Sequence, residues 1–469
     1  MGLAKYNFNL ILSLIVMSKR VVSVILEHGS CGWGKCYFCG WGKRRVECSL
    51  DELKGRIFNM LSSKRREGEI DLLKVFSSGS FLDPKQFPDD FVSWFIRLCE
   101  SFGVKELIVE SRPEYITEDR LKLLLSGKVK VTVAIGLELA DDNILLNYYC
   151  KGLRVDDVVN AVKVLRGHGF GVRLYLLVNG HPYLYSNPEI HKRIFEDSIK
   201  LALDLADSVV VINAYPHVGS RLWEDWINGS WRPFDEEEFK SFVGGWGMHP
   251  KVELDFNNLN FIPKFPREKQ IFLHGVGHDY LVHPYYEVWQ DYIVRFYKPP
   301  KSKDIALFLP CAYRKPYTRS KTWKAILNAI YSLPIFPRIH LIAVSSPGVI
   351  PYEFINYYPF QSYDWPEWLE TEEIKREYIE VTKIRVKKYL MKHASNYKIF
   401  YAYFRYGAET LTAIIEAFRD LGLSDKLRVV IDEGLAMEIE AEGFKPMVAH
   451  PKALNKLREM LSEAASSKG

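Results

Sequence analysis

The stretch Cys31-Gly-Trp-Gly-Lys-Cys36-Tyr-Phe-Cys39 carries three thiols in the spacing C-x4-C-x2-C. It follows the run VVSVIL at 21–26, whose continuous apolar and β-branched pattern is typical of a strand buried on both faces. A loop this short can aim three sulfurs at one inorganic centre. The sequence therefore predicts a metal or cluster site directly after the first strand.

Strand and helix patterns alternate from this loop onward. Six strands are expected, at residues 21–26, 71–76, 106–110, 130–136, 171–178 and 208–214. Repeated βα units form parallel sheets with right-handed crossovers. We therefore predict an α/β fold built on a partial (β/α)6 TIM-type barrel, with its core at about residues 20–235.

Polar residues collect where these predicted strands end. In barrels of parallel strands the reactive groups lie at the carboxyl ends, so we expect these residues to share a pocket with the cysteine loop. Taken singly, the Glu–x–Arg pair could be a structural ion pair, and the serine-rich segment an ordinary turn. The residues are Ser77, Ser78, Gly79, Ser80, Glu110, Arg112, Glu138 and Asn213.

Composition places the chain among ordinary globular proteins. It has 469 residues, 48% hydrophobic and 26% charged, and a formal net charge of +5, which permits a polyanionic partner without requiring one. This length predicts two or three domains.

Seven cysteines, an odd number, favour a reducing compartment and hence the cytoplasm. The apolar run 8–17 lacks a cleavage site, so we expect neither export nor a membrane span, and Met17 is an alternative start.

The cysteine spacing resembles that of the radical S-adenosylmethionine (SAM) superfamily, with one residue more than its commonest form, C-x3-C-x2-C. The resemblance implies a [4Fe–4S] cluster on Cys31, Cys36 and Cys39, whose open iron binds SAM, and Phe38 packed against the adenine of SAM. A structural zinc ion with Cys48 or His28 as fourth ligand is the rival interpretation. Zinc sites do not need six βα units, which favours the cluster.

Further motifs resemble the radical SAM subunit that completes archaeosine biosynthesis in archaeal tRNA. They are VESRPEYI at 109–116, AIGLELADD at 134–142 and Lys151-Gly152. The resemblance covers about residues 20–235. It implies cleavage of the C–N bond of a lysine joined to 7-cyano-7-deazaguanine, which leaves a formamidine. One segment departs from the family, because Asn-Gly-His-Pro at 179–182 stands where Lys-Pro-Pro is expected.

The same resemblance assigns roles to the residues at the strand ends. Ser77 to Ser80 would meet the amino acid end of SAM. Glu110, Arg112 and Glu138 would line the pocket for SAM and substrate.

A second, smaller α/β domain is expected after a Lys- and Pro-rich linker. We predict a first domain at 1–296, the linker at 297–304 and the second domain at 305–469. The segment 309–320, LPCAYRKPYTRS, resembles the archaeosine synthase signature Pro-Cys-x3-Lys-Pro-Tyr-x2-Ser-x2-His, and the likeness extends over about 305–440. That family adds the lysine.

This second resemblance makes Cys311, Lys315 and Ser320 candidate catalytic residues. Trp323 stands where the family has His, so transfer by this chain could be slow or absent. Cys311 at a helix start could have a lowered pKa and act as a nucleophile, or it could be buried and inert.

Basic residues gather in three segments, which are the predicted helix 372–393 and the clusters at 43–45 and 64–66. Their side chains could neutralise tRNA phosphates, or they could simply form solvent-exposed surface. We therefore expect a cytoplasmic tRNA-modifying enzyme of archaeosine biosynthesis. A separate archaeosine synthase and a tRNA-guanine transglycosylase are further candidate partners, and no membrane is expected. The alternatives are a radical SAM enzyme for another RNA base and a non-catalytic, zinc-stabilised RNA-binding protein.

Overall fold

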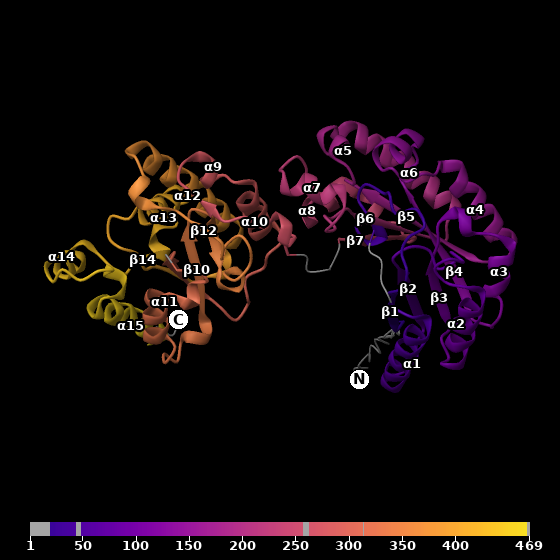
Figure 1. Ribbon diagram of the computed structural model, residues 1–469, viewed down its shortest axis with the longest axis horizontal. Helices are drawn as coiled ribbons and strands as arrows, with labels where there is room; N and C mark the ends of the chain where they lie inside the picture. The colour runs from indigo at the N-terminus through magenta and orange to yellow at the C-terminus, as the bar shows by residue number, and fades with distance from the viewer. Residues whose placement is uncertain (1–18, 44–47, 257–261, 313, 467–469) are drawn as a thin grey trace, which may run out of the picture. The chain divides into compact units, whose positions relative to one another are not determined.

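The computed structural model describes residues 19–43, 48–256, 262–312 and 314–466. Met17, the apolar run 8–17 and most of the basic cluster 43–45 lie outside these ranges. The chain divides into two compact units (Figure 1). The first is Met1–Trp223 with Glu236–Asn258, and the second is Glu224–Asp235 with Leu259–Gly469.

The first unit contains a seven-stranded sheet in which every pair of neighbours is parallel and the strands follow chain order. This arrangement confirms the partial barrel, and the edge strands β1 and β7 leave it open. The sequence did not predict β7, because its short run Val-Glu-Leu-Asp alternates charge with apolar residues and is half exposed. The strands are β1 (Val21–Leu26), β2 (Leu72–Ser77), β3 (Glu106–Glu110), β4 (Lys130–Glu138), β5 (Gly171–Val178), β6 (Ser208–Asn213) and β7 (Val252–Asp255).

Helices connect successive strands and lie along the outer side of this sheet in Figure 1. The first begins at the predicted capping box, in which Glu52 N–H donates to the Ser49 hydroxyl and Ser49 N–H donates to the Glu52 carboxylate. Each longer helix turns an apolar stripe to the strands. The helices are α1 (Leu50–Glu67), α2 (Asp89–Ser101), α3 (Glu118–Leu124), α4 (Val155–Gly167), α5 (Pro182–Ser186), α6 (Pro188–Leu205), α7 (Arg221–Ile227) and α8 (Glu236–Val243).

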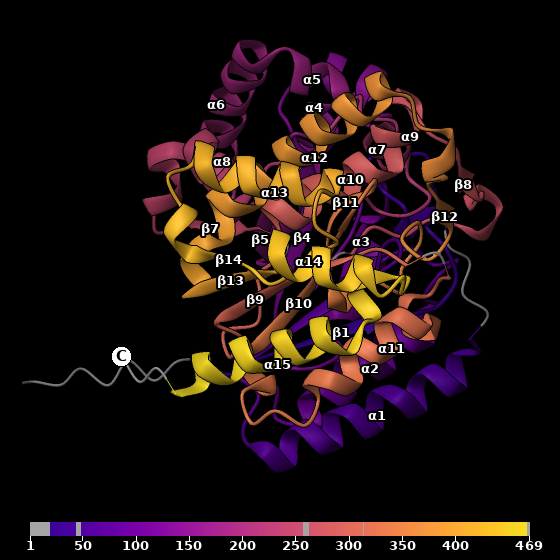
Figure 2. The same cartoon turned by 90° about the vertical axis from the view of Figure 1, so that its left-hand side faces the viewer.

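The second unit is built on a five-stranded sheet in the order β11-β10-β9-β13-β14, parallel except for the β10–β11 pair. Figure 2 shows α12 and α13 on one side of these strands and α11 and α15 on the other. The strands are β9 (Ile305–Pro310), β10 (Ile339–Ser345), β11 (Gly348–Pro351), β13 (Ile399–Ala402) and β14 (Leu427–Val429). The helices are α11 (Lys321–Ile330), α12 (Glu372–His393), α13 (Glu409–Asp420), α14 (Glu433–Ala441) and α15 (Pro451–Ser466).

Residues ahead of β9 also belong to the second unit, including the expected linker 297–304. A small parallel pair joins β8 (Leu273–His274) to β12 (Tyr363–Asp364), and α9 (His278–Leu281) precedes α10 (Pro284–Arg295). In α10 the Trp289 indole donates to the Tyr358 carbonyl at 2.9 Å. Within the described residues no helix is long and apolar enough to cross a bilayer.

Candidate functional site

The cysteine loop lies on the carboxyl ends of the parallel strands. A Cβ on Gly79, in the turn after β2, would fall 2.9 Å from Cys31 Cα, and one on Gly42 would fall 3.0 Å from Cys31 Cβ. Tyr37 N–H donates to the Tyr149 carbonyl at 2.9 Å. Glycine is therefore required at 79 and 42 for the loop to close against its neighbours.

Burial dominates the protonation of two of the three thiols. It raises the pKa of Cys36 to about 11, although the nearby cations of Lys151 and Arg112 act in the opposite direction. Burial also raises the pKa of Cys39, whose sulfur accepts a hydrogen bond from Gly42 N–H at 3.4 Å. The charge of Cys39 acts on the pKa of Cys36, and the charge of Cys31 acts on the pKa of Cys39, so the three thiols share one environment.

The donor chemistry of this loop fits a thiolate-bound cluster. Three cysteines converge on one loop, and two cations are close enough to offset the negative charge that metal binding creates by deprotonating the thiols. In the part of the chain that the structure describes, no three His, Cys, Asp or Glu side chains already stand at the spacing of an ion site. The proposed zinc ligand His28 instead bonds to the Cys48 carbonyl at 2.5 Å.

A buried ion pair lies beneath the cysteine loop. Glu138, at the end of β4, pairs with Lys151, and each side chain is only 9% exposed. Glu138 has φ +62°, and the register of the β4–β5 pair shifts beside it. This irregularity turns the Glu138 carboxylate toward Lys151 Nζ. Glu138 and the Cys36 thiolate offset the burial of Lys151 and raise its pKa.

Arg112 connects the strand ends to one another. Its backbone N–H donates to the Ser80 hydroxyl at 3.1 Å, and its Nη1 donates to the Lys151 carbonyl at 3.1 Å. Its guanidinium also lies 5.4 Å from the centre of the Trp33 ring in the cysteine loop. Arg112 thus connects its own strand end with Ser80, with the Lys151 segment and with the cysteine loop. That these residues form one pocket for SAM and substrate stays a prediction.

Glu110 is the last residue of β3. Burial raises its pKa to about 7, against the opposing hydrogen bond from Tyr175 on β5. Its carboxyl group is therefore close to half protonated at neutral pH. Asn213, also predicted here, is buried at the end of β6.

The serine-rich turn after β2 is braced by a residue that the sequence did not single out. Gln86 Nε2 donates to the Ser78 hydroxyl at 2.9 Å and to the His28 carbonyl at 2.8 Å, and Gln86 Oε1 accepts from Ser80 N–H at 3.1 Å. Gly79 N–H lies 3.4 Å from the Ser77 hydroxyl. This turn is fixed rather than loose, which suits a binding role.

Phe38 packs edge-to-face on Tyr149, with ring centres 5.2 Å apart. The Tyr149 hydroxyl donates to the Leu177 carbonyl at 3.0 Å and accepts from Gly180 N–H at 3.2 Å. The segment that departs from the family pattern therefore serves to hold Tyr149. The contact of Phe38 with adenine stays a prediction.

In the second unit, Cys311 follows β9 and faces Ser345 at the end of β10. Burial raises the pKa of Cys311, although Lys315 opposes the effect, which favours the buried, inert thiol of the two interpretations over a nucleophile activated by the helix start. Lys315 Nζ lies 3.8 Å from the centre of the Tyr363 ring, and burial lowers its pKa. Ser320 is buried at the N-cap of α11.

Trp323 occupies the position of the family histidine. Its indole is fully buried, stacks on Tyr317 with ring centres 5.0 Å apart, and donates to the Pro310 carbonyl at 3.0 Å. The Tyr317 hydroxyl is in turn 2.6 Å from that of Tyr363. Trp323 therefore packs against the Cys311 loop through Pro310 and Tyr317.

Most basic residues of the other predicted segments are already paired. On α12, Lys375, Lys383 and Lys387 contact Glu372, Glu380 and Asp420, and Arg385 is buried. On α1, Lys64 contacts Glu67. These pairs favour solvated or structural faces over phosphate binding.

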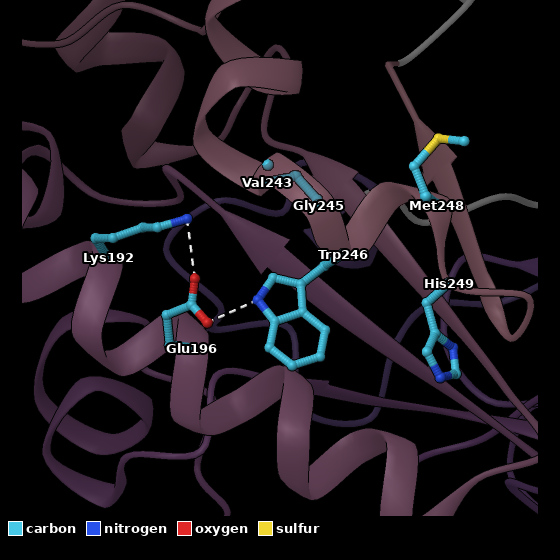
Figure 3. A pocket seen from close by; sticks show the side chains of 8 residues that line it. Lys192, Glu196, Val243, Gly245, Trp246, Met248 and His249 are labelled. Atoms are coloured by element: carbon cyan, nitrogen blue, oxygen red, sulfur yellow. Dashed lines mark hydrogen bonds and ion pairs between the residues drawn. The ribbon is translucent and has the colours of Figure 1, made fainter.

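The described residues of the first unit line pockets at two places relevant to the site. Figure 3 shows one on α6, where Glu196 binds Lys192 at 3.0 Å and accepts from the Trp246 indole at 2.6 Å. Its polar groups satisfy one another, and none of the predicted site residues lines it. The other pocket adjoins the cysteine loop.

Comparisons with known proteins find similarity to both subunits of archaeosine synthase. A family profile described as a domain of unknown function (DUF5591) matches residues 287–421. The chain is 28% identical over 225 residues to archaeosine synthase subunit beta of Methanosarcina acetivorans, which covers 46% of this chain and 63% of that protein. It is 40% identical over 90 residues to archaeosine synthase subunit alpha of Thermoplasma acidophilum, covering 18% and 17%.

Two further similarities concern proteins with other names. A tRNA uridine(34) acetyltransferase of Methanocaldococcus infernus is 25% identical over 284 residues, or 50% of this chain and 52% of that protein. The solved structure of queuine lyase from Clostridium spiroforme is 20% identical with a TM-score of 0.36, and covers 50% of this chain and 90% of that one. The chain spans about half the length of the curated relatives it matches. The predicted resemblance to both parts of archaeosine synthase is confirmed.

Proposed function

We propose that this protein is a radical SAM enzyme of tRNA modification that breaks the C–N bond of a lysine attached to a 7-cyano-7-deazaguanine base and leaves the formamidine. One observation carries the proposal. The cysteine loop lies above a buried Glu138–Lys151 pair and Arg112 at the carboxyl ends of a parallel sheet. The chain that forms this site is similar to archaeosine synthase subunit beta.

Each residue has a role that follows from its surroundings. Cys31, Cys36 and Cys39 would hold a [4Fe–4S] cluster, which with bound SAM supplies a hydrogen-abstracting radical. Lys151 and Arg112 offset the thiolate charge beside Cys36. The turn Ser77–Ser80, fixed by Gln86, is suited to hold the amino acid end of SAM. Phe38 packs on Tyr149 beside the last cysteine of the loop.

Glu110 is suited to move or hold a proton near the substrate. A carboxyl group with a pKa of about 7 can donate or accept a proton at neutral pH with little free-energy change. Tyr175 orients it. A formamidine carries basic nitrogens. Glu110 alone could therefore exchange the proton that such a nitrogen gains or loses.

We assign the second unit to binding of the lysine-bearing base, with lysine addition as a further activity. Cys311, Lys315 and Ser320 lie around one strand end, and burial favours the neutral forms of Cys311 and Lys315. Neutral Lys315 is a better nucleophile or base than its ammonium form. Trp323 does not replace the family histidine in proton transfer, because its N–H is bonded to Pro310.

The test begins with anaerobic reconstitution of the full chain with iron and sulfide, followed by SAM and dithionite. Formation of 5′-deoxyadenosine by protein with three to four irons per chain is expected, as [4Fe–4S] ligation requires. Good cluster loading without this product would overturn the radical mechanism. Tight zinc and no iron uptake would favour the RNA-binding alternative.

The substrate is decided by mass spectrometry of nucleosides after incubation with tRNA that carries the lysine adduct. We expect loss of the adduct and appearance of the formamidine nucleoside. The similarity to a tRNA uridine(34) acetyltransferase favours one second candidate, an acyl modification of uridine. An unchanged adduct together with a new uridine derivative would support that candidate instead.

A further inference from the structure

A pocket of about 480 Å³ beside the cysteine loop, here called the basic pocket, is separate from the residues assigned above to cluster and SAM. Its walls come from the cysteine loop, from the segment after β4 and from the start of α7 after β6. Each of the three segments comes after the carboxyl end of a strand, namely β1, β4 and β6. The basic pocket therefore opens on the same edge of the barrel as the cluster site. Its lining residues are Trp33, Gly34, Lys35, Lys43, Leu146, Cys150, Gly152 and Arg221.

Three of the lining side chains are exposed cations, and no carboxylate lines the basic pocket. Lys43 Nζ donates to the Gly219 carbonyl at 3.0 Å, Lys35 lies 5.0 Å from the Trp33 ring centre, and Arg221 Nη1 is 4.0 Å from Cys150 Sγ. Within the described ranges, none of the three forms an ion pair with Asp or Glu. By contrast, the cations of α12 and α1 are mostly paired. This concentration of unneutralised charge points to an anionic ligand.

The remaining walls define what kind of anion fits. Trp33 and Leu146 are apolar, and the lining contains no Ser, Thr, Asn, Gln, Asp or Glu side chain. The basic pocket thus lacks acceptors for ribose hydroxyls or for the donors on base edges. The basic pocket can bind an anionic group without contacting base edges, which is how proteins bind the phosphates of a nucleic-acid backbone. Its volume is large enough for a phosphodiester with part of its sugar.

We propose that the basic pocket binds a backbone phosphate of the RNA beside the nucleotide that enters the barrel, a proposal that rests on the proposed function. Lys35, Lys43 and Arg221 contact the phosphate, and Trp33 packs on the adjoining sugar. The RNA backbone then bridges the outside of the cysteine loop while one base reaches Glu110 and Lys151. A free phosphate or nucleotide would use the same cations, so the experiment must separate these sources.

The test measures binding of the reconstituted full chain to a labelled tRNA transcript by fluorescence anisotropy at several salt concentrations. Each cation–phosphate contact contributes about one to the slope of log affinity against log salt. We expect Arg221→Glu and Lys43→Glu each to weaken binding about tenfold and to lower the slope by about one. Lys122→Glu on α3 is the matched control, because Lys122 is exposed, pairs with Asp119 and lies in the same unit.

Three readouts decide between outcomes. Equal affinity and slope for Arg221→Glu and Lys122→Glu would overturn the proposal. Loss of inorganic phosphate binding by Arg221→Glu, with wild-type binding of the tRNA, would overturn it in favour of a small-anion site. Arg221→Lys should restore most of the affinity, and thermal unfolding shows whether each variant is folded. The binding result does not depend on turnover, so failure to form 5′-deoxyadenosine would refute the proposed function and leave this test intact.

Discussion

The two cysteine-bearing loops of this protein follow equivalent positions, the carboxyl ends of parallel strands, yet their surroundings are opposite. The strand before the first loop, β1, is a half-exposed edge strand, so the prediction of a strand buried on both faces is wrong, whereas β9 is buried over Ile305–Leu309. The loop after β1 is enclosed by charges, namely the Glu138–Lys151 pair and Arg112. The loop after β9 is enclosed by aromatic rings, with Lys315 against Tyr363. The first environment tolerates the net negative charge of a thiolate cluster, and the second favours neutral groups.

This difference teaches that strand topology provides the place for chemistry, and that the local charge balance decides which chemistry it is. Burial raises the pKa of Cys36 and of Cys311 alike. Cys36 faces two cations, however, and Cys311 faces one. The following experiments test the contrast.

The largest effect is expected from removing a thiol. Cys36→Ala should lower iron content strongly and reduce 5′-deoxyadenosine formation at least about a hundredfold, because a cluster needs its thiolate ligands. Cys311→Ala is the matched control and should keep the full iron content. Iron analysis and the broad visible absorption of the reconstituted proteins measure both. Equal iron loss in the two variants would refute the division between the loops.

A second contrast concerns the two buried lysines. Lys151→Met leaves Glu138 buried without its partner and should lower the free energy of unfolding by about 3–5 kcal/mol. Lys315→Met should lower the free energy of unfolding by only about 1 kcal/mol. In the described residues Lys315 contacts the Tyr363 ring and forms no ion pair with a carboxylate, so its removal leaves no unpaired charge. Urea unfolding compares them. Adding Glu138→Gln to Lys151→Met should recover part of the loss.

The pH dependence of stability should reveal Glu110. Its pKa is about 7 in the folded protein, against an ordinary value of 4.5, so the folded state binds more protons between these pH values. Stability from this group is thus full below about pH 4.5 and falls as pH rises toward 7. Relative to Glu110→Gln, the wild type should lose about 3 kcal/mol between pH 4.5 and 8. A constant difference across that range would contradict the assignment.

The sequence predicted the strands and the placement of Glu110, Arg112 and Glu138 because alternation and strand ends are local patterns. It missed the partners that come from elsewhere in the chain. Lys151 meets Glu138 through an irregularity in β4, Tyr175 reaches Glu110 across the sheet, and Gln86 braces a turn that precedes it. Such pairings depend on three-dimensional register, which spacing does not encode. For Cys311 the sequence left a lowered pKa and a buried, inert thiol both open, because a helix start and burial act in opposite directions on a thiol.

The smallest predicted effect concerns the aromatic loop itself. The Tyr317 and Tyr363 hydroxyls are 2.6 Å apart and buried, and Lys315 lies on the Tyr363 ring. Tyr363→Phe keeps the ring under Lys315 but removes one hydroxyl, so the free energy of unfolding should fall by about 1 kcal/mol. In a double-mutant cycle with Tyr317→Phe, the coupling should also be about 1 kcal/mol.

The double-mutant cycle separates two explanations of this loop. If the two hydroxyls bond chiefly to each other, each single variant and the double variant lose similar stability and the coupling is near 1 kcal/mol. Additive losses would show that each hydroxyl has a different partner, and the network around Cys311 would then extend to Ser345, which interacts with both Cys311 and Tyr363. At the first loop the Glu138–Lys151 pair is charged, so removing one partner leaves a buried charge instead of an unpaired hydroxyl. The two loops therefore differ in how they respond to loss of one partner as well as in what they hold.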